Sequence, residues 1–381
     1  MATGGSGKVM KECMLTGFGG YHKLKVVDAP KPGSPGDGQV LIKVVASGIN
    51  FAELHARQGM YKSKDGKVTP PCVLGMEASG TVEEVGKGVE TLQVGDRVFC
   101  INMFELWKEY VVIPANRAFV MPDEMSFEEA ASIPVNYLTA YLMLFDFGNL
   151  RKNKSVLCHM AAGGVGFAVT QLCKTVENVT VFGTSSEHKH KAIQANGVDH
   201  PIDYRTKDYV EEVRKISPNG VDIVLDPLCG ADTKKGYDLL KPMGKLIIFG
   251  AANGMTGEHK SFTNLASMWW SLPTFKPLSM MTSNKSVAGF HLGYLSGDDE
   301  SEAMITDAAA DLVRMYKEGL IKPHVDSVWP FEKAGDAMKY IADRKNVGKV
   351  VLSWEKKDDT EEKKEGGGEK KDEGNEKPGV L

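Results

Sequence analysis

From about Tyr137 the sequence alternates short apolar runs with amphipathic stretches, and this alternation restricts the fold more than any other feature of the chain. The apolar runs predict strands, and the stretches that follow them predict helices. Repeated strand–helix units with continuously apolar strands are typical of a parallel sheet covered on both faces. Right-handed crossovers then give an α/β fold with a doubly wound, Rossmann-type domain. The predicted strands are Ser155–Met160, Asn178–Gly183, Val221–Asp226 and Lys245–Gly250, and the predicted helices are Val165–Thr175, Glu187–Ala195, Tyr209–Ile216 and Lys234–Leu240.

A glycine-rich turn follows the first of these strands. Its residues are Ala161, Ala162, Gly163, Gly164, Val165 and Gly166. They match the dinucleotide fingerprint, with alanine in place of the first glycine. Gly163 would let the backbone approach a pyrophosphate, and Gly166 would let the helix pack closely on the strand. Glycine runs also occur in ordinary tight turns, but a position between an apolar strand and a helical pattern favours nucleotide binding at the helix N-terminus.

The end of the second strand indicates which dinucleotide binds. NAD-binding domains place a carboxylate there to hold the ribose 2′-hydroxyl, but this chain has Ser185. A hydroxyl beside Lys189 suits a 2′-phosphate, and Thr184 and Tyr204 complete a plausible pocket for it. The sequence therefore predicts NADP(H) as the cofactor. In the alternative interpretation, Ser185 or Ser186 only caps a solvated helix and Lys189 is only exposed.

The rest of the chain predicts a second, β-rich unit. Short alternating or apolar runs at Val40–Val45, Ala78–Val85 and Arg97–Ile101 are separated by glycines and prolines, as in a compact β-barrel. Two helical patterns, at Ser301–Glu318 and Phe331–Arg344, precede a last strand at Lys349–Trp354. We expect that strand to return to the first unit.

Composition excludes several classes of function. Residues 355–381 carry ten acidic residues and seven lysines, which leaves residues 1–354 near neutral and without a basic surface for nucleic acid. Six cysteines without a CxxC pair are typical of reduced thiols. No apolar stretch is long enough to span a bilayer, and no targeting segment is recognisable, so we expect a cytoplasmic location. The segment 355–381 is predicted to be disordered, either as a solubilising tail or as a tether to a partner or membrane surface.

Several motifs in order resemble the quinone oxidoreductase branch of the medium-chain dehydrogenase/reductase superfamily. They are SGINFAELHARQGMY (Ser47–Tyr61), PCVLGMEASGTVEEVG (Pro71–Gly86), LQVGDRV (Leu92–Val98), NYLTAY (Asn136–Tyr141), AAGGVG, VDIVLDPLCG and NVGKVVL (Asn346–Leu352). GFHLGYL (Gly289–Leu295) and IKPHVDSVWPFEK (Ile321–Lys333) are more similar still to the vesicle amine transport protein group, the synaptic vesicle membrane protein homologues. The resemblance implies a GroES-like catalytic domain (1–137 and 290–354), a Rossmann NADP(H)-binding domain (138–289) and a homodimer.

The resemblance also implies a reductase that works without zinc. Zinc-dependent relatives carry a cysteine and a Gly-His-Glu where this chain has Asn50 and Gly75-Met76-Glu77, a set unsuited to tetrahedral zinc. Hydride would pass from NADPH to a small apolar carbonyl or quinone whose oxygen is polarised by hydrogen bonds. Asn50 would anchor ribose or substrate oxygen, and Thr139 would touch the nicotinamide. Phe290 and Leu292 would line the nicotinamide pocket, and Asn346 and Lys349 would contact the cofactor.

Each of these assignments has a structural alternative. Asn50 can be a turn former, Thr139 a helix cap and Phe290 a core residue. His55 stands where many quinone oxidoreductases have a tyrosine. It could donate a proton near neutral pH or be a surface side chain, and it puts efficient quinone reduction in doubt.

The segment Phe262–Met281 holds Trp269, Trp270 and three methionines with one charged residue, Lys276. It could pack at a subunit interface, dip into a membrane surface or receive a long apolar substrate. Two functions therefore compete. One is an NADPH-dependent reductase of quinones or activated enones. The other is an adaptor on the vesicle or mitochondrial surface that keeps the reductase fold with little turnover.

Overall fold

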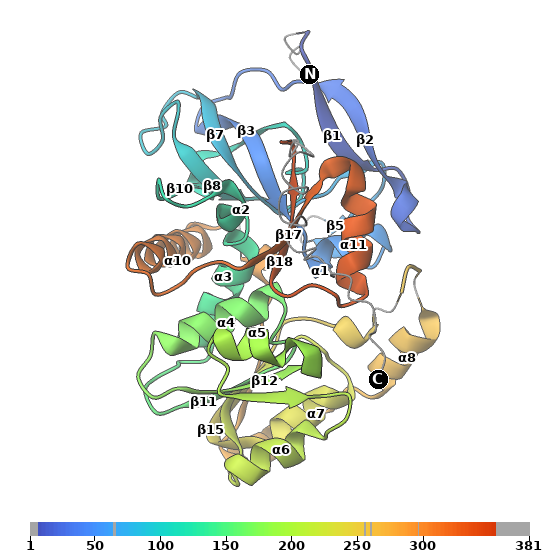
Figure 1. Ribbon diagram of the computed structural model, residues 1–381, viewed down its shortest axis with the longest axis vertical. Helices are drawn as coiled ribbons and strands as arrows, with labels where there is room; N and C mark the ends of the chain where they lie inside the picture. The colour runs from blue at the N-terminus through green and yellow to red at the C-terminus, as the bar shows by residue number, and fades with distance from the viewer. Residues whose placement is uncertain (1–6, 64–65, 255–256, 260, 296, 356–381) are drawn as a thin grey trace, which may run out of the picture.

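The computed structural model describes residues 7–63, 66–254, 257–259, 261–295 and 297–355, and it consists of two lobes (Figure 1). The expected disordered segment lies, apart from Glu355, outside the described residues. Strands from the first third of the chain and from its end build the upper lobe, and the middle of the chain builds the lower one. The domain division at residues 137 and 290 stays a prediction, and residue 137 lies inside helix α3 (Pro134–Tyr141). No described helix is long and apolar enough to cross a membrane.

The upper lobe is formed mainly by antiparallel strands. The order β10-β8-β7-β3-β18-β17 runs across its larger sheet, with β9 also paired to β3, and the order β2-β1-β6 across its smaller one. The predicted strands at Val40–Val45, Ala78–Val85 and Arg97–Ile101 are confirmed within β3, β7 and β8. The bounds are β1 (Val9–Leu15), β2 (Leu24–Pro30), β3 (Gln39–Gly48), β4 (Lys62–Ser63), β5 (Gly66–Lys67), β6 (Cys72–Val73), β7 (Glu77–Val85), β8 (Arg97–Ile101), β9 (Tyr110–Pro114), β10 (Ala118–Val120), β17 (Val325–Pro330) and β18 (Lys349–Ser353).

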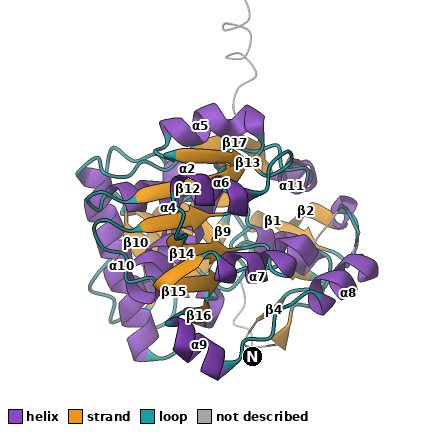
Figure 2. Cartoon of the chain, turned by 90° about the horizontal axis from the view of Figure 1, so that it is seen from below, coloured by secondary structure: helices purple, strands orange, loops and turns teal. Residues whose placement is uncertain are grey.

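The lower lobe contains a six-stranded parallel sheet in the order β13-β12-β11-β14-β15-β16, which confirms the predicted doubly wound domain (Figure 2). Its central strand β11 is buried on both faces. Val156 and Cys158 pack into one core with α3, α4 and α10, while Leu157 packs into another beside α6. This is the alternation that a strand imposes on successive side chains. The bounds are β11 (Ser155–Cys158), β12 (Thr180–Ser185), β13 (His200–Asp203), β14 (Val221–Asp226), β15 (Leu240–Ile248) and β16 (Ser286–Gly289).

The helices connect these sheets and cover them. The 3-10 turn Glu187–Lys189 comes before α5, and a π-helix (Leu142–Phe147) continues α3. The bounds are α1 (Phe51–Arg57), α2 (Phe127–Ala130), α3 (Pro134–Tyr141), α4 (Gly164–Lys174), α5 (His190–Ala195), α6 (Tyr209–Ile216), α7 (Ala231–Asp238), α8 (Phe262–Trp270), α9 (Pro277–Ser283), α10 (Asp299–Lys317) and α11 (Ala334–Ala342).

Two sequence predictions needed correction. The helix predicted at Lys234–Leu240 is shifted toward the N-terminus as α7, because Leu240 already begins strand β15. Strand β17 (Val325–Pro330, VDSVWP) was missed, since its first five residues are all half-buried and give no alternation of buried and exposed side chains. It pairs in parallel with β18, which in turn pairs with β3. The last strand therefore returns to the first lobe, as predicted.

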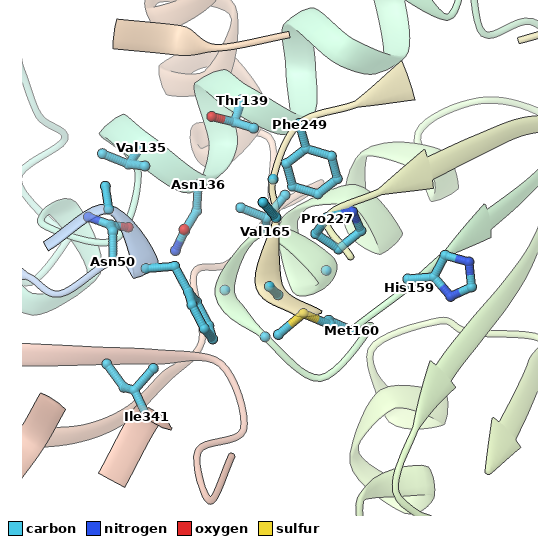
Figure 3. A pocket seen from close by; sticks show the side chains of 18 of the residues that line it. Asn50, Val135, Asn136, Thr139, His159, Met160, Val165, Pro227, Phe249 and Ile341 are labelled. Carbon is cyan, nitrogen blue, oxygen red and sulfur yellow. The ribbon is translucent and has the colours of Figure 1, made fainter. Parts of the chain in front are cut away.

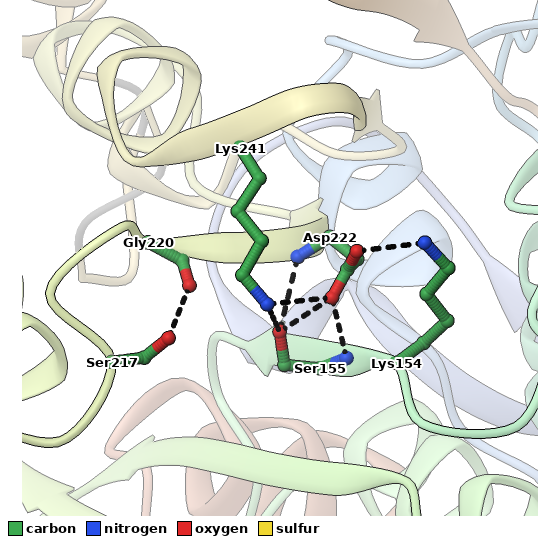
Figure 4. Close-up of polar contacts among 6 residues, drawn as sticks. All are labelled: Lys154, Ser155, Ser217, Gly220, Asp222 and Lys241. Carbon is green, nitrogen blue, oxygen red and sulfur yellow. Dashed lines mark hydrogen bonds and ion pairs between the residues drawn. The ribbon is translucent and has the colours of Figure 1, made fainter.

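A polar clasp joins the amino ends of three parallel strands (Figure 4). Asp222 of β14 accepts hydrogen bonds from the Lys154 and Lys241 ammonium groups, both at 2.9 Å, and from the backbone N–H and hydroxyl of Ser155. Burial raises the pKa of the Asp222 carboxyl, but these donors outweigh it and hold that pKa at about 2. The clasp lies at the sheet edge opposite the glycine-rich turn and stabilises the lobe rather than the site.

Candidate active site

A cavity of about 960 Å³ lies between the lobes, and both lobes contribute to its wall (Figure 3). The glycine-rich turn and the carboxyl ends of the parallel strands form one side. The beginning of α1, helix α3 and the beginning of β18 form the other. Ligands of doubly wound sheets bind at the carboxyl ends of the strands, so this is where a dinucleotide is expected.

The glycine-rich turn has the geometry that its sequence predicted. Strand β11 ends at Cys158 and α4 begins at Gly164. A Cβ on Gly166 would lie 2.6 Å from the Cα of Ala161 and from the Met160 carbonyl oxygen, so only glycine permits this close packing. A Cβ on Gly163 would meet only the Met160 carbonyl oxygen, at 3.3 Å, which leaves the backbone open to the cavity. Phosphate oxygens can therefore approach the N–H groups that begin α4.

Thr184 forms hydrogen bonds that hold the residues at the start of this turn. Its hydroxyl accepts a hydrogen bond from the Met160 backbone N–H at 3.3 Å and lies 3.2 Å from His159 Nδ1, and its carbonyl oxygen accepts from the Ala161 N–H. Thr184 lines the cavity, but its hydroxyl is already engaged. Thr184 therefore shapes the turn, and its place in a 2′-phosphate pocket stays a prediction.

The other predicted phosphate residues gather at one end of the cavity. Ser185, Lys189 and Tyr204 all line it, together with Arg344, which the sequence analysis had not assigned to the site. Arg344 Nη1 donates to the Tyr204 hydroxyl at 3.2 Å. Burial raises the pKa of Tyr204, but hydrogen bonds from Arg344, Ser186 and Arg205 outweigh it and lower the pKa to about 8. The Tyr204 oxygen is thus surrounded by positive charge and donors.

Lys189 also holds the wall of this end together. Its ammonium donates to the backbone carbonyl oxygens of Arg344, at 2.7 Å, and Asn346, at 2.6 Å. Lys189 is buried, and burial lowers the pKa of its ammonium. The predicted contact of Asn346 with a ligand fits its place on the wall, although its side chain donates to the Gly348 carbonyl oxygen.

The charges on the wall are strongly one-sided. Among the described residues that line the cavity, none is an aspartate or a glutamate, whereas Lys62, Lys189, Arg344 and Lys349 are cationic. Such a wall suits a ligand with several phosphates. An acidic residue in place of Ser185 would instead repel a 2′-phosphate.

The middle of the cavity is apolar with a few polar groups. Thr139 of α3 and the predicted Phe290 and Leu292 line it, and Phe290 packs edge-to-face on Phe147 at 5.7 Å. The Thr139 hydroxyl has no hydrogen-bond partner in the described part of the chain. Asn136, one helical turn before Thr139 in α3, was missed by the sequence analysis. Its side chain lies so close to the glycine-rich turn that a Cβ on Gly164 would come within 2.3 Å of Asn136 Nδ2. An apolar slot with these groups suits a nicotinamide ring.

Asn50 lies at the start of α1 and is held by buried charged groups. Its Nδ2 donates to Glu77 Oε1 at 2.8 Å, and its Oδ1 accepts from Lys349 Nζ at 2.6 Å. Lys349 also forms an ion pair with Glu77, which accepts from the Val135 N–H at the start of α3. Glu53 accepts from the backbone N–H of Asn50 at 2.8 Å. Lys349 thus lines the cavity as predicted, but its ammonium is committed to the protein.

His55 lies on the cavity wall, but its predicted role as a proton donor needs correction. Burial lowers the pKa of its imidazole to about 4, so the ring is neutral at pH 7. The protonated form that a general acid needs would be about a thousandth of the population. A neutral imidazole can still donate one N–H to a ligand oxygen.

No group of three or more His, Cys, Asp or Glu side chains suited to a metal ion occurs among the residues that the structure describes. Where zinc-dependent relatives carry their ligands, Asn50 and the Met76 backbone instead bond to Glu53 and Glu77.

Comparison with known proteins relates this site to a family. Residues 36–123 match the model of the alcohol dehydrogenase GroES-like domain, and residues 196–352 match that of the zinc-binding dehydrogenase. The chain is 53% identical over 341 residues to the synaptic vesicle membrane protein VAT-1 homolog of Homo sapiens, an alignment that covers 89% of this chain and 85% of that protein. This chain belongs to the VAT-1 family. The family lies within the medium-chain dehydrogenase/reductase superfamily, which confirms the resemblance seen in the motifs.

Solved structures share the fold of this VAT-1 family member. The human VAT-1 homolog-like protein matches with a TM-score of 0.80 and 41% identity, over 92% of this chain and 99% of that one. A mycobacterial protein solved as a complex with NADPH matches with a TM-score of 0.77 and 30% identity, over 90% and 99%. The predicted combination of a GroES-like unit and a Rossmann unit is therefore confirmed. These neighbours support an oxidoreductase-family fold and a nicotinamide cofactor for this chain.

Proposed function

We propose that this VAT-1 family member is an NADPH-dependent, zinc-independent reductase of quinones or activated enones and carbonyls. The observation that carries the proposal is the cavity wall, whose described lining residues include no carboxylate and which places Lys189 and Arg344 at one end. Ser185, Tyr204 and Arg344 stand where a 2′-phosphate would lie, which favours NADP(H) over NAD(H). The NADPH complex of the mycobacterial neighbour supports the same choice.

The residues of this chain would divide the work between binding and orientation. The turn at Gly163–Gly166 would hold the pyrophosphate, and Phe290, Leu292 and Thr139 would hold the nicotinamide. When bound, NADPH supplies a hydride. Asn50 and His55, both on the wall, would donate hydrogen bonds to the substrate oxygen. The apolar side chains of the cavity would exclude water and accept an apolar substrate.

The test is a turnover assay in which the loss of NADPH absorbance is followed with 1,4-naphthoquinone and with an unsaturated aldehyde as probes. We expect turnover with at least one probe, unchanged after dialysis against a chelator and with less than a tenth of a zinc ion per chain by elemental analysis. Asn50→Ala should lower kcat. Arg314→Ala, an exposed change on α10 outside the cavity, serves as the control. No turnover with either probe would contradict the proposal.

The segment that contains α8 and α9 exposes apolar side chains, and this feature supports a second function. Trp269 is 70% and Trp270 85% exposed on α8, and Leu278 and Met281 are exposed on α9. The relatives' names place them at synaptic vesicle membranes. We infer as the alternative an adaptor that associates peripherally with a vesicle or mitochondrial outer membrane from the cytoplasm. The same surface could instead form the interface of a homodimer, which we also propose.

Flotation with liposomes and sedimentation velocity separate these alternatives. If the surface binds membranes, the change of Trp269 and Trp270 to serine reduces flotation and leaves the sedimentation coefficient unchanged. If it is a dimer interface, the same change produces monomers. The alternative function is lost if this variant, also lacking residues 355–381, still floats with liposomes and associates with organelles as the wild type does.

A further inference from the structure

We propose that Glu77 and Lys349 are positioning residues that fix the carboxamide of Asn50 so that it presents one N–H donor, and no acceptor, to the oxygen of a carbonyl substrate. The proposal rests on the reductase function above and deepens it. It defines the chemistry of the substrate atom at this point of the cavity, which is a hydrogen-bond acceptor.

The orientation of the Asn50 amide follows from the chemistry of its partners. A carboxylate only accepts hydrogen bonds and an ammonium only donates them. The atom 2.8 Å from Glu77 Oε1 must therefore be the amide nitrogen, and the atom 2.6 Å from Lys349 Nζ must be the oxygen. Exchanging the two would place donor against donor and acceptor against acceptor.

The partners leave only one group of the side chain unused. The oxygen faces the Lys349 ammonium and also, in a capping box with Glu53, the backbone N–H of Glu53. One N–H of the amide goes to Glu77. No partner for the second N–H is found among the described residues, and Asn50 borders the cavity. A ligand atom opposite Asn50 therefore meets a donor.

The burial of these charges indicates that they serve more than stability. Glu53 and Glu77 are fully buried and Lys349 is 3% exposed. A buried ion pair is on average no more stabilising than a well-packed apolar pair of the same size. The Glu77–Lys349 pair has an effect that an apolar pair lacks, because it fixes which atom of the Asn50 amide faces which way.

The network also connects to the cofactor turn. The backbone N–H of Gly348, the residue before Lys349, donates to the Ala162 carbonyl oxygen at 2.9 Å. Glu77 Oε2 accepts from the Val135 N–H at the start of α3, the helix that carries Asn136 and Thr139. The position of the Asn50 donor is thus defined relative to the turn and to the nicotinamide slot.

The experiment compares four proteins: the wild type, Asn50→Ala, the pair variant Glu77→Leu/Lys349→Met, and the triple variant. Loss of one donor to a developing oxyanion typically lowers kcat by a factor on the order of 100. We expect that loss in Asn50→Ala and in the pair variant, and no further loss when they are combined. The KM for NADPH should change less than about threefold. If kcat of the triple variant instead falls by the product of the two separate factors, the proposal is overturned.

A second readout does not depend on turnover. In protein labelled with [15N]asparagine, the Asn50 carboxamide should give two separate, slowly exchanging proton signals, assigned by their loss in Asn50→Ala. They should shift and exchange faster in the pair variant, and unchanged signals would overturn the proposal. If the wild type turns over no probe, the reductase function fails and the carboxamide signals alone decide the positioning role.

Two further variants complete the design. Lys31→Met/Glu83→Leu removes a partly buried ion pair of the same lobe outside the cavity and should leave kcat and the Asn50 signals unchanged. If the pair variant does not fold, Asn50→Asp takes its place, since it is nearly isosteric but replaces the N–H donor by an oxygen. It should lose about as much kcat as Asn50→Ala while binding NADPH, and unchanged turnover would overturn the proposal.

Discussion

Arg344→Ala should weaken NADPH binding and leave NADH binding nearly unchanged. The half-buried guanidinium of Arg344 lies at the phosphate end of the cavity, beside Tyr204 and 3.2 Å from its hydroxyl. A hydrogen bond to a charged group contributes about 1.5–3 kcal/mol. Because 1.4 kcal/mol is tenfold in a dissociation constant, the Kd for NADPH should rise about 10- to 100-fold. NADH lacks the 2′-phosphate, so its Kd should change less than about twofold.

The assay is the increase in nicotinamide fluorescence on titration with each cofactor. Arg314→Ala on α10 is the matched control, because it removes the same side chain outside the cavity and should change neither Kd. Arg344 is a cleaner choice than Lys189, whose ammonium supports the backbone at residues 344 and 346 and would disturb both cofactors. If Arg344→Ala weakened NADH as much as NADPH, the 2′-phosphate would not lie at this end of the cavity.

Three further predictions follow from the same structure. Ser185→Asp should raise the Kd for NADPH more than that for NADH, since a carboxylate repels the 2′-phosphate, and equal effects in the two titrations would show that the phosphate lies elsewhere. Because the pKa of Tyr204 is lowered to about 8, a negative phenolate forms as pH rises through 8 and should weaken NADPH binding. Tyr204→Phe should remove this pH dependence in titrations from pH 6.5 to 9.5, and a pH profile of the variant like that of the wild type would refute the prediction. Asp222 titrates at about 2, against an ordinary 3.8, so its stabilising effect is present above about pH 4 and is lost as pH falls through 2. Asp222→Asn should therefore lower the free energy of unfolding by about 1–2 kcal/mol at pH 7, with a difference from wild type that shrinks toward pH 2 in urea melts; a difference independent of pH would contradict the role of the charge.

The elements that could be predicted from the sequence are those that depend on a pattern of neighbouring residues. Four of the six parallel strands, the glycine-rich turn and the last strand were found because burial and tight turns leave regular patterns over a few residues, whereas the short strands β13 and β16 were missed. Lys189 and Tyr204 line the cavity because each follows a strand, β12 or β13, whose carboxyl end lies at the same sheet edge as the turn. His55 was placed on the wall correctly, but its lowered pKa depends on burial that one sequence does not show.

Contacts between distant segments were not predictable in this way. Arg344 reaches Tyr204 across 140 residues, and Lys349 reaches Asn50 across 299. Arg344 was visible only as the last residue of a helical pattern, and Glu77 only as part of a motif that lacks the zinc-binding histidine. Asn136 could have been suspected, since it begins the motif that also contains Thr139. Lys349 and Glu77 meet Asn50 because β18 and β7 both pair with β3 within the upper lobe, whereas Arg344 meets Tyr204 where the two lobes face each other.

The measurement that most directly tests the central claim is a pair of fluorescence titrations of the wild-type protein, with NADPH and with NADH, under the same conditions. The cation-lined cavity end at Ser185, Tyr204 and Arg344 predicts that NADPH binds at least about tenfold more tightly than NADH, which corresponds to one charge-assisted hydrogen bond to the 2′-phosphate. Equal affinities, tighter binding of NADH or no binding of NADPH would contradict it.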